Sequence, residues 1–563
     1  MMRRILLLPS ARLLPLEPQV EFGEIPSAMV PLGSRPALHY IAEQYVRNDF
    51  HVVVSVHSQS DQVKRYVARH PELRASTIDV GHTESLGETI LRTLETLNET
   101  DQLVINFADT FVADPLAGGN TVCYSQLDDV FRWTTFELDD ERTIIRIVDK
   151  NQRKNTDGPL PVFVGVFAMD RAREFEVELS RALDRDAGID PFYTAVQAYF
   201  NNLGRDEKSF QLVSDWRDFG HLDTYYFTKR AFGLNHRSFN SLILDGQRRT
   251  VRKSSSDVDK LSGEIQWYLK LPRDLAYIAP RVFDYSLDGA ASFVELEFYA
   301  YPTLSDIYLF GDCETGLWRR IFRAVEWTMR EMRLHRDEAA DAVLVRSAMK
   351  EMYEDKTRKK LEQIAGREEF KQLSGFETRI NGRTCFGILG VLERLPSVIS
   401  SVNLYAQDHV AVIHGDLCLA NILYDRRNDA VRLIDPRGRF GSFDTHGDPR
   451  YDLAKLSHSI EGDYDFLLND LFDLACEGGD VRLRPHIDDR HEKVKKLFRG
   501  MFFDGGRPHE YEAVRLIEGL LFLSMVPLHP DRPRSQIAFL VRGLEIFSSV
   551  VEGRFRAMGV SQR

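Results

Sequence analysis

The sequence predicts two domains of different fold class: an α/β domain with a mostly parallel sheet, followed by an α+β domain. Three observations support this prediction. The chain has 563 residues, more than a single hydrophobic core usually serves. Residues 1–233 alternate strand-like and helix-like runs, as βαβ units do. Residues 238–563 instead open with a hairpin pattern and an amphipathic run. A short polar linker, 233–237, fits between the two domains.

Three apolar runs of the first domain are candidates for buried strands: 5–8, 51–56 and 103–107. Helix-like runs at 36–47 and 84–97 fall between them. Strands separated by helices form mostly parallel sheets, and ligands bind at the carboxyl ends of such strands. Asp109 follows the third strand, where a carboxylate can hold a metal ion. An ordinary turn aspartate is the alternative at this position.

Composition narrows the class of protein. Hydrophobic residues make up 43% of the chain and charged residues 28%, as in ordinary globular proteins. A formal net charge of −12 gives no indication of a nucleic-acid partner. The five cysteines show no C-x-x-C spacing, which suits a reducing compartment. The apolar run at 5–8 ends at Pro9, too short for a signal peptide, and the run at 516–528 is interrupted by polar residues. We therefore expect a cytoplasmic protein without a membrane span.

The second domain carries the pattern His414-Gly415-Asp416, then Asn421, and after an aliphatic run Asp435-Pro436. This order is the layout of a kinase active site. Asp416 is placed where a carboxylate can accept a proton from a substrate hydroxyl. Asn421 and Asp435 offer oxygen ligands for Mg²⁺ on nucleotide phosphates. The alternative is a buried loop whose Asp416 and Asn421 only cap backbone groups.

These residues resemble the aminoglycoside phosphotransferase and choline kinase family, a small-molecule branch of the protein-kinase fold. The resemblance implies that Asp416 is the catalytic base, that Asn421 and Asp435 bind Mg²⁺, and that ATP is the phosphoryl donor. The segment 447–454 is similar to the family's G-D-P-x-x-D-L-A run. There Asp452 would tie the start of a helix back to the catalytic loop.

A nucleotide-binding lobe is predicted upstream of that pattern. A hairpin around Asp245-Gly246 brings Lys253 to the end of a strand, where its ammonium can reach the α- and β-phosphates. Glu264, on the amphipathic run that follows, is the expected ion-pair partner of Lys253. An exposed lysine at a strand end is the alternative. No glycine-rich loop is present before Lys253.

Two further segments bear on substrates of the second domain. The run 293–299 resembles the strand and hinge against which adenine lies, which makes Glu297 and Tyr299 candidate ATP contacts. The charge-rich run 335–373 is helical in period. It indicates a solvated helix face with i,i+4 ion pairs, or alternatively a helical insertion that closes over the acceptor substrate.

The first domain carries a different resemblance. Residues 25–38 resemble the P-K-A-M-x-P-x-x-x-K-P-L segment of sugar-phosphate nucleotidyltransferases with a GT-A-like fold. Asp109 matches that family's strand-end metal aspartate. Residues 216–221 resemble its W-x-D-x-G segment, whose aspartate, here Asp218, is the second metal ligand. The resemblance implies that Asp109 and Asp218 hold one Mg²⁺ between the nucleotide and the attacking phosphate.

The same comparison shows departures from the family. Its opening G-x-G-T-R is matched by residues 8–12, in which Arg12 remains as a candidate nucleotide contact. The two glycines are replaced by Leu8 and Ser10, and the phosphate-binding lysine by Ser27. Glycines let the backbone approach a nucleotide closely, so these replacements favour a degenerate domain that binds or scaffolds. Retained Asp109 and Asp218 favour an enzyme.

Together the two resemblances imply a bifunctional enzyme. One half phosphorylates a small alcohol or sugar with ATP, and the other activates the resulting phosphate as an NDP derivative with CTP or UTP. This pairing is expected in bacterial surface polysaccharide (capsule) biosynthesis. The alternatives are a sugar kinase fused to a uridylyltransferase, and an active kinase with a degenerate N-terminal domain that binds a nucleotide sugar. A homo-oligomer is possible in each case.

Overall fold

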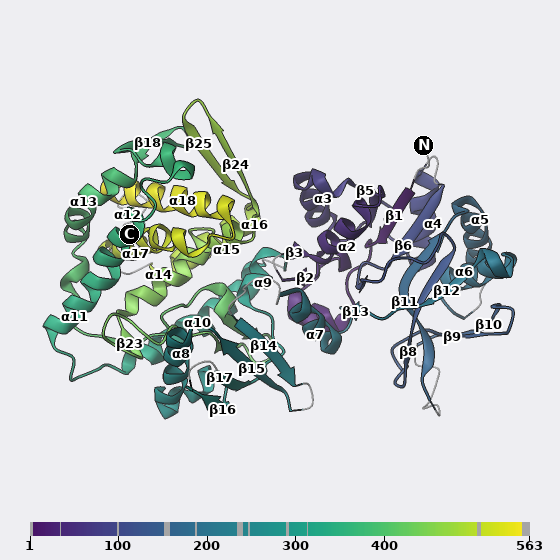
Figure 1. Ribbon diagram of the computed structural model, residues 1–563, viewed down its shortest axis with the longest axis horizontal. Coiled ribbons are helices and arrows are strands. Elements are labelled where there is room, and N and C mark those ends of the chain that lie inside the picture. The colour runs from purple at the N-terminus through teal and green to yellow at the C-terminus, as the bar shows by residue number, and fades with distance from the viewer. Residues whose placement is uncertain are drawn as a thin grey trace. The chain divides into compact units, whose positions relative to one another are not determined.

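A computed structural model describes residues 4–33, 35–97, 101–150, 158–185, 188–233, 240–245, 248–288, 292–311, 314–503 and 508–553. The chain forms two compact units, Met1–His236 and Arg237–Arg563 (Figure 1). Most of the expected linker, together with Gly246 of the expected hairpin turn, lies outside the described residues.

The first unit is built on a nine-stranded sheet. Its strands are β1 (Arg4–Pro9), β4 (His51–Val56), β5 (Ala75–Asp79), β6 (Gln102–Asn106), β8 (Thr121–Leu127), β9 (Thr135–Leu138), β10 (Ile144–Val148), β11 (Leu160–Met169) and β12 (Ser209–Leu212). The three strands expected from the sequence are β1, β4 and β6, and they run parallel side by side with β5 at the edge. β11 joins β6 and β8 antiparallel, while β12 pairs with β8 in parallel. The parallel sheet predicted from the sequence therefore corresponds to the strands β6, β1, β4 and β5.

The first unit has seven described helices, five of which cover the two faces of this sheet (Figure 1). They are α1 (Leu16–Phe22), α2 (Ala37–Val46), α3 (Ser60–Arg69), α4 (Leu86–Thr96), α5 (Ala172–Leu183), α6 (Pro191–Asn202) and α7 (Leu222–Gly233). α2 and α3 link the parallel strands on one face, and α4, α5 and α6 pack together on the other. That second face holds the main core, in which Phe167, Phe175 and Phe192 are fully buried. Ser85 caps α4 by accepting a hydrogen bond from the backbone N–H of Glu88 at 3.0 Å.

Short strands complete the first unit. β2 (Pro31–Leu32) pairs with β3 (Arg35–Pro36), and β7 (Thr110–Val112) pairs with β13 (Trp216–Asp218). The second pair matters for function because β7 directly follows the carboxyl end of β6. It brings the Trp216–Asp218 segment next to the strand end where Asp109 lies.

The second unit opens with an antiparallel sheet in the order β14-β15-β17-β16. These strands are β14 (Asn240–Asp245), β15 (Thr250–Ser255), β16 (Val282–Ser286) and β17 (Phe293–Glu297). The expected hairpin is β14 and β15, in register with Asp245 opposite Thr250. The expected amphipathic run is helix α8 (Val258–Lys270), whose Asp257 cap accepts a hydrogen bond from the backbone N–H of Lys260.

The remainder of the second unit is mainly helical. Its helices are α9 (Leu304–Leu309), α10 (Thr315–Leu334), α11 (Ala342–Met349), α12 (Lys356–Glu362), α13 (Ile388–Ser401), α14 (Pro449–Ile460), α15 (Tyr464–Leu468), α16 (Asp489–Phe502), α17 (Pro508–Met525) and α18 (Pro533–Val551). A π-helix, η7 (Lys350–Asp355), joins α11 to α12 within the expected charge-rich helical run. In the part of the chain that the structure describes, we find no helix with the length and apolarity needed to cross a membrane.

Small sheets lie among these helices. β20 (Ala411–Val412) pairs with β23 (His446–Gly447), and β21 (Ile422–Asp425) pairs with β22 (Ala430–Leu433). A separate four-stranded sheet has the order β19-β18-β25-β24, formed by β18 (Glu377–Ile380), β19 (Arg383–Phe386), β24 (Phe472–Glu477) and β25 (Asp480–Pro485). The loop between β20 and β21 contains the H-G-D-x-x-x-x-N motif, and the segment after β22 begins with Ile434 and Asp435.

Candidate active sites

The loop between β20 and β21 is held in one conformation by buried hydrogen bonds. His414 is fully buried, and its Nδ1 accepts a hydrogen bond from the backbone N–H of Asp416 at 3.2 Å. Nε2 therefore carries the proton and donates to the carbonyl of Ile434 at 3.0 Å. Burial lowers the pKa of His414 to about 4, which keeps the ring neutral. The Asp452 carboxylate accepts the backbone N–H groups of His414 and Gly415 at 2.7 and 2.8 Å.

Asp416 is positioned by two neighbours. The side-chain amide of Asn421 donates to the backbone carbonyl of Asp416 at 2.9 Å and to its carboxylate at 3.3 Å. The Lys455 ammonium lies 2.8 Å from the other carboxylate oxygen. Burial alone would raise the pKa of Asp416, but the charge and hydrogen bond of Lys455 hold it well below its usual range. Asp416 is therefore an ionised acceptor whose carboxylate can orient a hydroxyl group.

Lys455 is a site residue that the sequence analysis missed. It lies on α14, one turn after Asp452, which was expected to anchor this helix to the loop. Residues three apart on a helix share a face. The position of Asp452 was therefore the signal that could have found Lys455.

Lys253, Glu264 and Asp435 meet although they come from three separate segments. The Lys253 ammonium lies 2.6 Å from Glu264 Oε2 on α8 and 2.8 Å from Asp435 Oδ1 after β22. Burial alone would lower the pKa of Lys253, yet the two carboxylates raise it above its usual range. Asp435 has a left-handed backbone with φ of 56°, and its side chain remains half exposed. This carboxylate can therefore also bind a metal ion. Asn421 lies on the neighbouring loop, where its backbone carbonyl accepts a hydrogen bond from the backbone N–H of Ile434 at 3.0 Å.

The residues expected to contact adenine lie farther along the same sheet. Glu297 ends β17 opposite Thr250, three residues from Lys253 along β15, which is about 10 Å. The Tyr299 hydroxyl donates to Glu297 Oε2 at 2.9 Å. The Tyr299 ring stacks on Tyr301 with centroids 5.7 Å apart and an interplanar angle of 8°. Glu297 and Tyr299 are thus close to each other but apart from the charged cluster, a spacing that suits the base and phosphates of one nucleotide.

The segment that follows Asp435 approaches the backbone of α8 at a glycine. Gly438 has φ of +64°, and a Cβ there would lie 1.9 Å from the carbonyl oxygen of Gly263. We expect Gly438→Ala to destabilise the second unit by at least about 2 kcal/mol, because a backbone contact cannot yield as a side chain can. Gly382→Ala is the matched control, since its φ is +77° with nothing within 4 Å. Urea unfolding measures the free energy of unfolding of each variant, and Gly438→Ala should lose more of it than Gly382→Ala. Equal losses would contradict the prediction, because they would show that the positive φ alone, and not the contact with Gly263, destabilises Gly438→Ala.

Replacing Lys253, the lysine of the charged cluster, should destabilise the second unit. Lys253 is 8% exposed and Glu264 is 2% exposed. We expect Lys253→Met to lose about 3–5 kcal/mol of unfolding free energy, because Glu264 would remain as a buried charge without its partner. The double variant Lys253→Met/Glu264→Leu should recover part of this loss, and Lys260→Met, at an exposed position on α8, should change little. A double variant less stable than Lys253→Met would contradict the prediction.

Asp109 and Asp218 are brought together in the first unit. Ala108, at the end of β6, has φ of 63° and turns the chain so that β7 can pair with β13. In that pair Asp218 lies opposite Thr110, and the backbone N–H of Phe219 donates to the Asp109 carbonyl at 3.0 Å. A Cβ on Gly220 would approach Asp109 Oδ2 to 2.9 Å, so the glycine leaves room for this carboxylate.

The electrostatics of this pair fit a divalent cation. Burial, followed by the charge of Asp218, raises the pKa of Asp109 to about 7. Asp218 accepts hydrogen bonds from His221 Nδ1 at 3.0 Å and from the hydroxyl of Thr224. Two neighbouring carboxylates repel each other unless a cation offsets their charge. Hard oxygen donors of this kind suit Mg²⁺.

The loop after β1 stands where the nucleotidyltransferase family has its glycine-rich opening, and two serine side chains meet in it. Ser10 Oγ lies 3.1 Å from Ser27 Oγ and accepts the backbone N–H of Ala28 at 3.0 Å. These two serines stand at the positions of the second glycine and the phosphate-binding lysine in the resemblance. Arg12 is exposed in the same loop. The hydrogen bond between Ser10 and Ser27 therefore occupies groups that could otherwise contact a phosphate.

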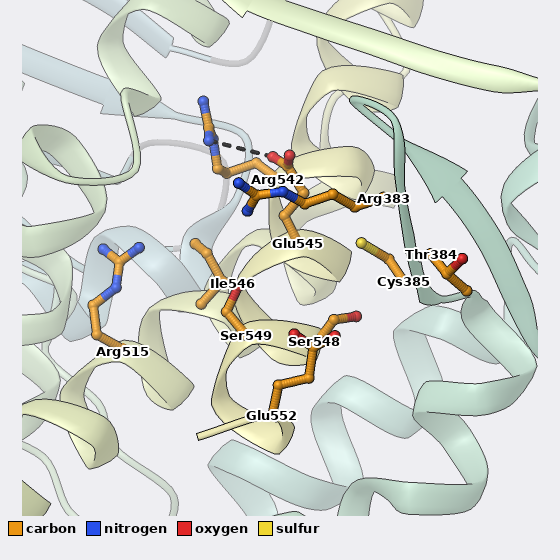
Figure 2. A pocket seen from close by; sticks show the side chains of 10 residues that line it. All are labelled: Arg383, Thr384, Cys385, Arg515, Arg542, Glu545, Ile546, Ser548, Ser549 and Glu552. Atoms are coloured by element: carbon orange, nitrogen blue, oxygen red, sulfur yellow. Dashed lines mark hydrogen bonds and ion pairs between the residues drawn. The ribbon is translucent and has the colours of Figure 1, made fainter. Parts of the chain in front are cut away.

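A pocket of about 170 Å³ lies apart from both sets of residues (Figure 2). It is bordered by β19, α17 and α18 and contains Arg383, Arg515 and Arg542. Arg515 pairs with Glu518 at 2.5 Å, and Arg542 pairs with Glu545 at 3.3 Å. None of the site residues expected from the sequence lines this pocket, and carboxylates balance much of its charge.

Comparisons with known proteins give limited similarity. No family model and no curated protein matches the chain. Solved nucleotidyltransferases are similar to its N-terminal part. HddC from Yersinia pseudotuberculosis, complexed with GMP-PN, is 15% identical and matches 41% of this chain and 100% of its own, with a TM-score of 0.29. The CTP:phosphocholine cytidylyltransferase LicC from Streptococcus pneumoniae is 13% identical and matches 41% and 99%, with a TM-score of 0.33. A nucleoside-diphosphate-sugar pyrophosphorylase from Vibrio cholerae RC9 is 13% identical and matches 40% and 99%, also with a TM-score of 0.33. TM-scores below 0.5 support no conclusion about the activity of this chain.

Proposed function

We propose that the protein is a bifunctional enzyme that phosphorylates a small hydroxyl compound with ATP and then activates the phosphate as an NDP derivative. The observation that carries the proposal is the convergence of Lys253, Glu264 and Asp435 beside the loop that holds Asp416 and Asn421. These residues come from four segments of the second unit. They supply the groups that phosphoryl transfer to an alcohol requires.

Each group has a distinct role in the phosphotransferase half. Asp416 would accept the hydrogen bond of the acceptor hydroxyl and take its proton as the hydroxyl oxygen bonds to the γ-phosphorus of ATP and the bond from that phosphorus to the departing ADP breaks. Lys253, oriented by Glu264, would contact the α- and β-phosphates of ATP. Asn421 and Asp435 would hold Mg²⁺, which when bound neutralises charge on the phosphates. Glu297 and Tyr299 would lie beside the adenine ring.

The nucleotidyltransferase half rests on the two neighbouring carboxylates. Asp109 and Asp218 would hold a second Mg²⁺ near the α-phosphate of CTP or UTP. Arg12 would contact that nucleotide from the loop after β1. The acceptor would be the phosphorylated alcohol or sugar made by the other half. Fusion of the two steps would raise the local concentration of this intermediate.

The pairing of these activities favours a role in bacterial surface polysaccharide (capsule) biosynthesis, in the cytoplasm and with small-molecule partners. A sugar kinase joined to a uridylyltransferase is the alternative within the same chemistry. The active molecule would be a monomer or a homo-oligomer.

One observation favours a second candidate function. Ser10 and Ser27 replace the second glycine and the phosphate-binding lysine of the family, and their side chains lie within hydrogen-bond distance of each other, which disfavours a bound triphosphate. The first unit would then be a degenerate domain that binds a nucleotide sugar beside an active kinase.

A direct assay separates these functions. The full-length protein is incubated with Mg²⁺, ATP and a panel of alcohols and sugars, and ADP formation is measured. Pyrophosphate release is measured in parallel with CTP, UTP, GTP and ATP on the matching phosphates. The bifunctional proposal expects both products, the degenerate alternative expects ADP alone, and the absence of ADP with every acceptor would count against the kinase half.

A further inference from the structure

Three cationic side chains from three different segments surround the Tyr451 hydroxyl, beside the loop that holds Asp416. Lys455 on α14 forms the 2.8 Å ion pair with Asp416. Arg437, two residues after Asp435, donates from Nη1 to the Tyr451 hydroxyl at 3.0 Å. Lys356 begins α12. Burial alone would raise the pKa of Tyr451, yet the three cations lower it, with Lys356 contributing most. The Tyr451 hydroxyl therefore lies within a strongly positive region.

Packing of the preceding π-helix places Lys356 in this region. Tyr353, one turn before it in η7, has its ring centroid 5.9 Å from that of Phe440 and 6.3 Å from that of Tyr451. The Tyr353 hydroxyl donates to Asp448 at 2.8 Å. Burial and the neighbouring cations lower the pKa of Lys356 to about 8. Single-turn π-helices are rare and are frequent at functional sites, because they redirect the side chains that follow.

The charge of this region is not balanced by the protein. Lys455 is matched by Asp416, but across the described ranges neither Lys356 nor Arg437 forms an ion pair with a carboxylate. Both side chains are partly buried. Two neighbouring cations repel each other, and partial burial strengthens that repulsion. An anion bound between them would remove this unfavourable interaction.

We propose, on the basis of the phosphotransferase function above, that the acceptor carries a carboxylate or phosphate group that Lys356 and Arg437 bind while Asp416 receives its hydroxyl. A guanidinium group binds either anion with two parallel hydrogen bonds, and the ammonium adds a point charge. A cationic acceptor, such as an amino alcohol or an aminoglycoside, is repelled at the same place. The substrate class is therefore a hydroxy acid, a sugar acid or a sugar phosphate.

The first test measures binding of a small dianion without any turnover. Malonate and its neutral analogue malonamide are titrated calorimetrically into the full-length protein. We expect malonate to bind at least about tenfold more tightly than malonamide, and Lys356→Gln and Arg437→Gln each to lose about tenfold in malonate affinity. Lys359→Gln, at an exposed position on the same helix, should bind malonate as the wild type does. Equal binding of malonate and malonamide, or equal effects at Lys356 and Lys359, would overturn the proposal.

The second test distinguishes the acceptor from the triphosphate. Lys356→Gln should leave the affinity for ATP unchanged and should raise KM for an anionic acceptor at least about tenfold. A matching loss of ATP affinity would mean that the cations bind the triphosphate, which would overturn the proposal. In ADP formation, D-glycerate should be preferred over glycerol and choline, and a preference for either of the latter would also overturn it. Malonate binding without phosphoryl transfer to any acceptor would reject the phosphotransferase function and leave the anion site in place.

Discussion

Asp416→Asn should reduce phosphoryl transfer by about 10²- to 10⁴-fold while leaving ATP affinity nearly unchanged. The amide keeps the shape of the carboxylate and can still accept the hydrogen bond of Lys455, which is 2.8 Å away in the wild type. It cannot take a proton from the acceptor hydroxyl. The loss should therefore fall on kcat, measured as ADP formation at saturating ATP and acceptor.

Two matched variants locate this effect. Asp408→Asn replaces an exposed carboxylate that precedes β20, outside the loop that holds Asp416, and should keep full turnover. Asp435→Ala should instead lose Mg²⁺-dependent ATP binding, because Asp435 both contacts Lys253 and offers a half-exposed carboxylate to a metal. Wild-type turnover by Asp416→Asn would remove the assignment of Asp416 as the base. Thermal unfolding of each variant shows whether a loss of activity reflects loss of the fold.

In the second unit, the site residues that the sequence predicted lie close to one another along the chain. Asp416 and Asn421 lie five residues apart in one loop, so the spacing itself places them together. Lys253 and Glu264 follow each other as strand and helix, and that order is enough to expect an ion pair. Lys356 is different, because its place near Tyr451 depends on how η7 packs, with the Tyr353 ring 6.3 Å from that of Tyr451. A long-range arrangement of this kind has no signature in residue spacing.

The first unit shows a similar division. Strands β1, β4 and β6 are continuous apolar runs with strongly buried residues, and their pattern predicted them. β5 was missed because its sequence Ala-Ser-Thr-Ile-Asp is largely polar and only partly buried at the sheet edge. The Ser10–Ser27 hydrogen bond was also beyond prediction, since the sequence shows only that two expected residue types are replaced. This hydrogen bond favours the alternative in which the first unit is a degenerate domain.

The carboxylate pair of the first unit should make metal-free stability fall as pH rises. The pKa of Asp109 is about 7 in the folded protein, raised by burial and then by Asp218. The unfolded value is about 3.9, so the folded state binds more protons between these two pH values. The contribution of Asp109 to stability is therefore largest below about pH 4 and is lost as pH rises to about 7.

Asp109→Asn should remove this dependence. Its amide resembles the neutral carboxyl group, so in EDTA at pH 8 the variant should be more stable than the wild type by on the order of 1–3 kcal/mol. At pH 5 the difference should shrink. Hydrogen exchange of peptides from β6 and β13 in the full-length protein measures the local free energy of opening. Asp128→Asn, which changes an exposed carboxylate, is the control.

In the presence of Mg²⁺ and CTP or UTP, the wild type should become more stable than Asp109→Asn. A cation between Asp109 and Asp218 offsets their repulsion, so the wild type gains stability by mass action and Asp109→Asn gains little. Pyrophosphate release should be lost in the same variant while ADP formation by the second unit continues. Equal stabilisation of both proteins by Mg²⁺ and nucleotide would show that this pair holds no metal. Because the closed Ser10–Ser27 contact already disfavours a triphosphate, that result would leave the first unit as a scaffold for the kinase.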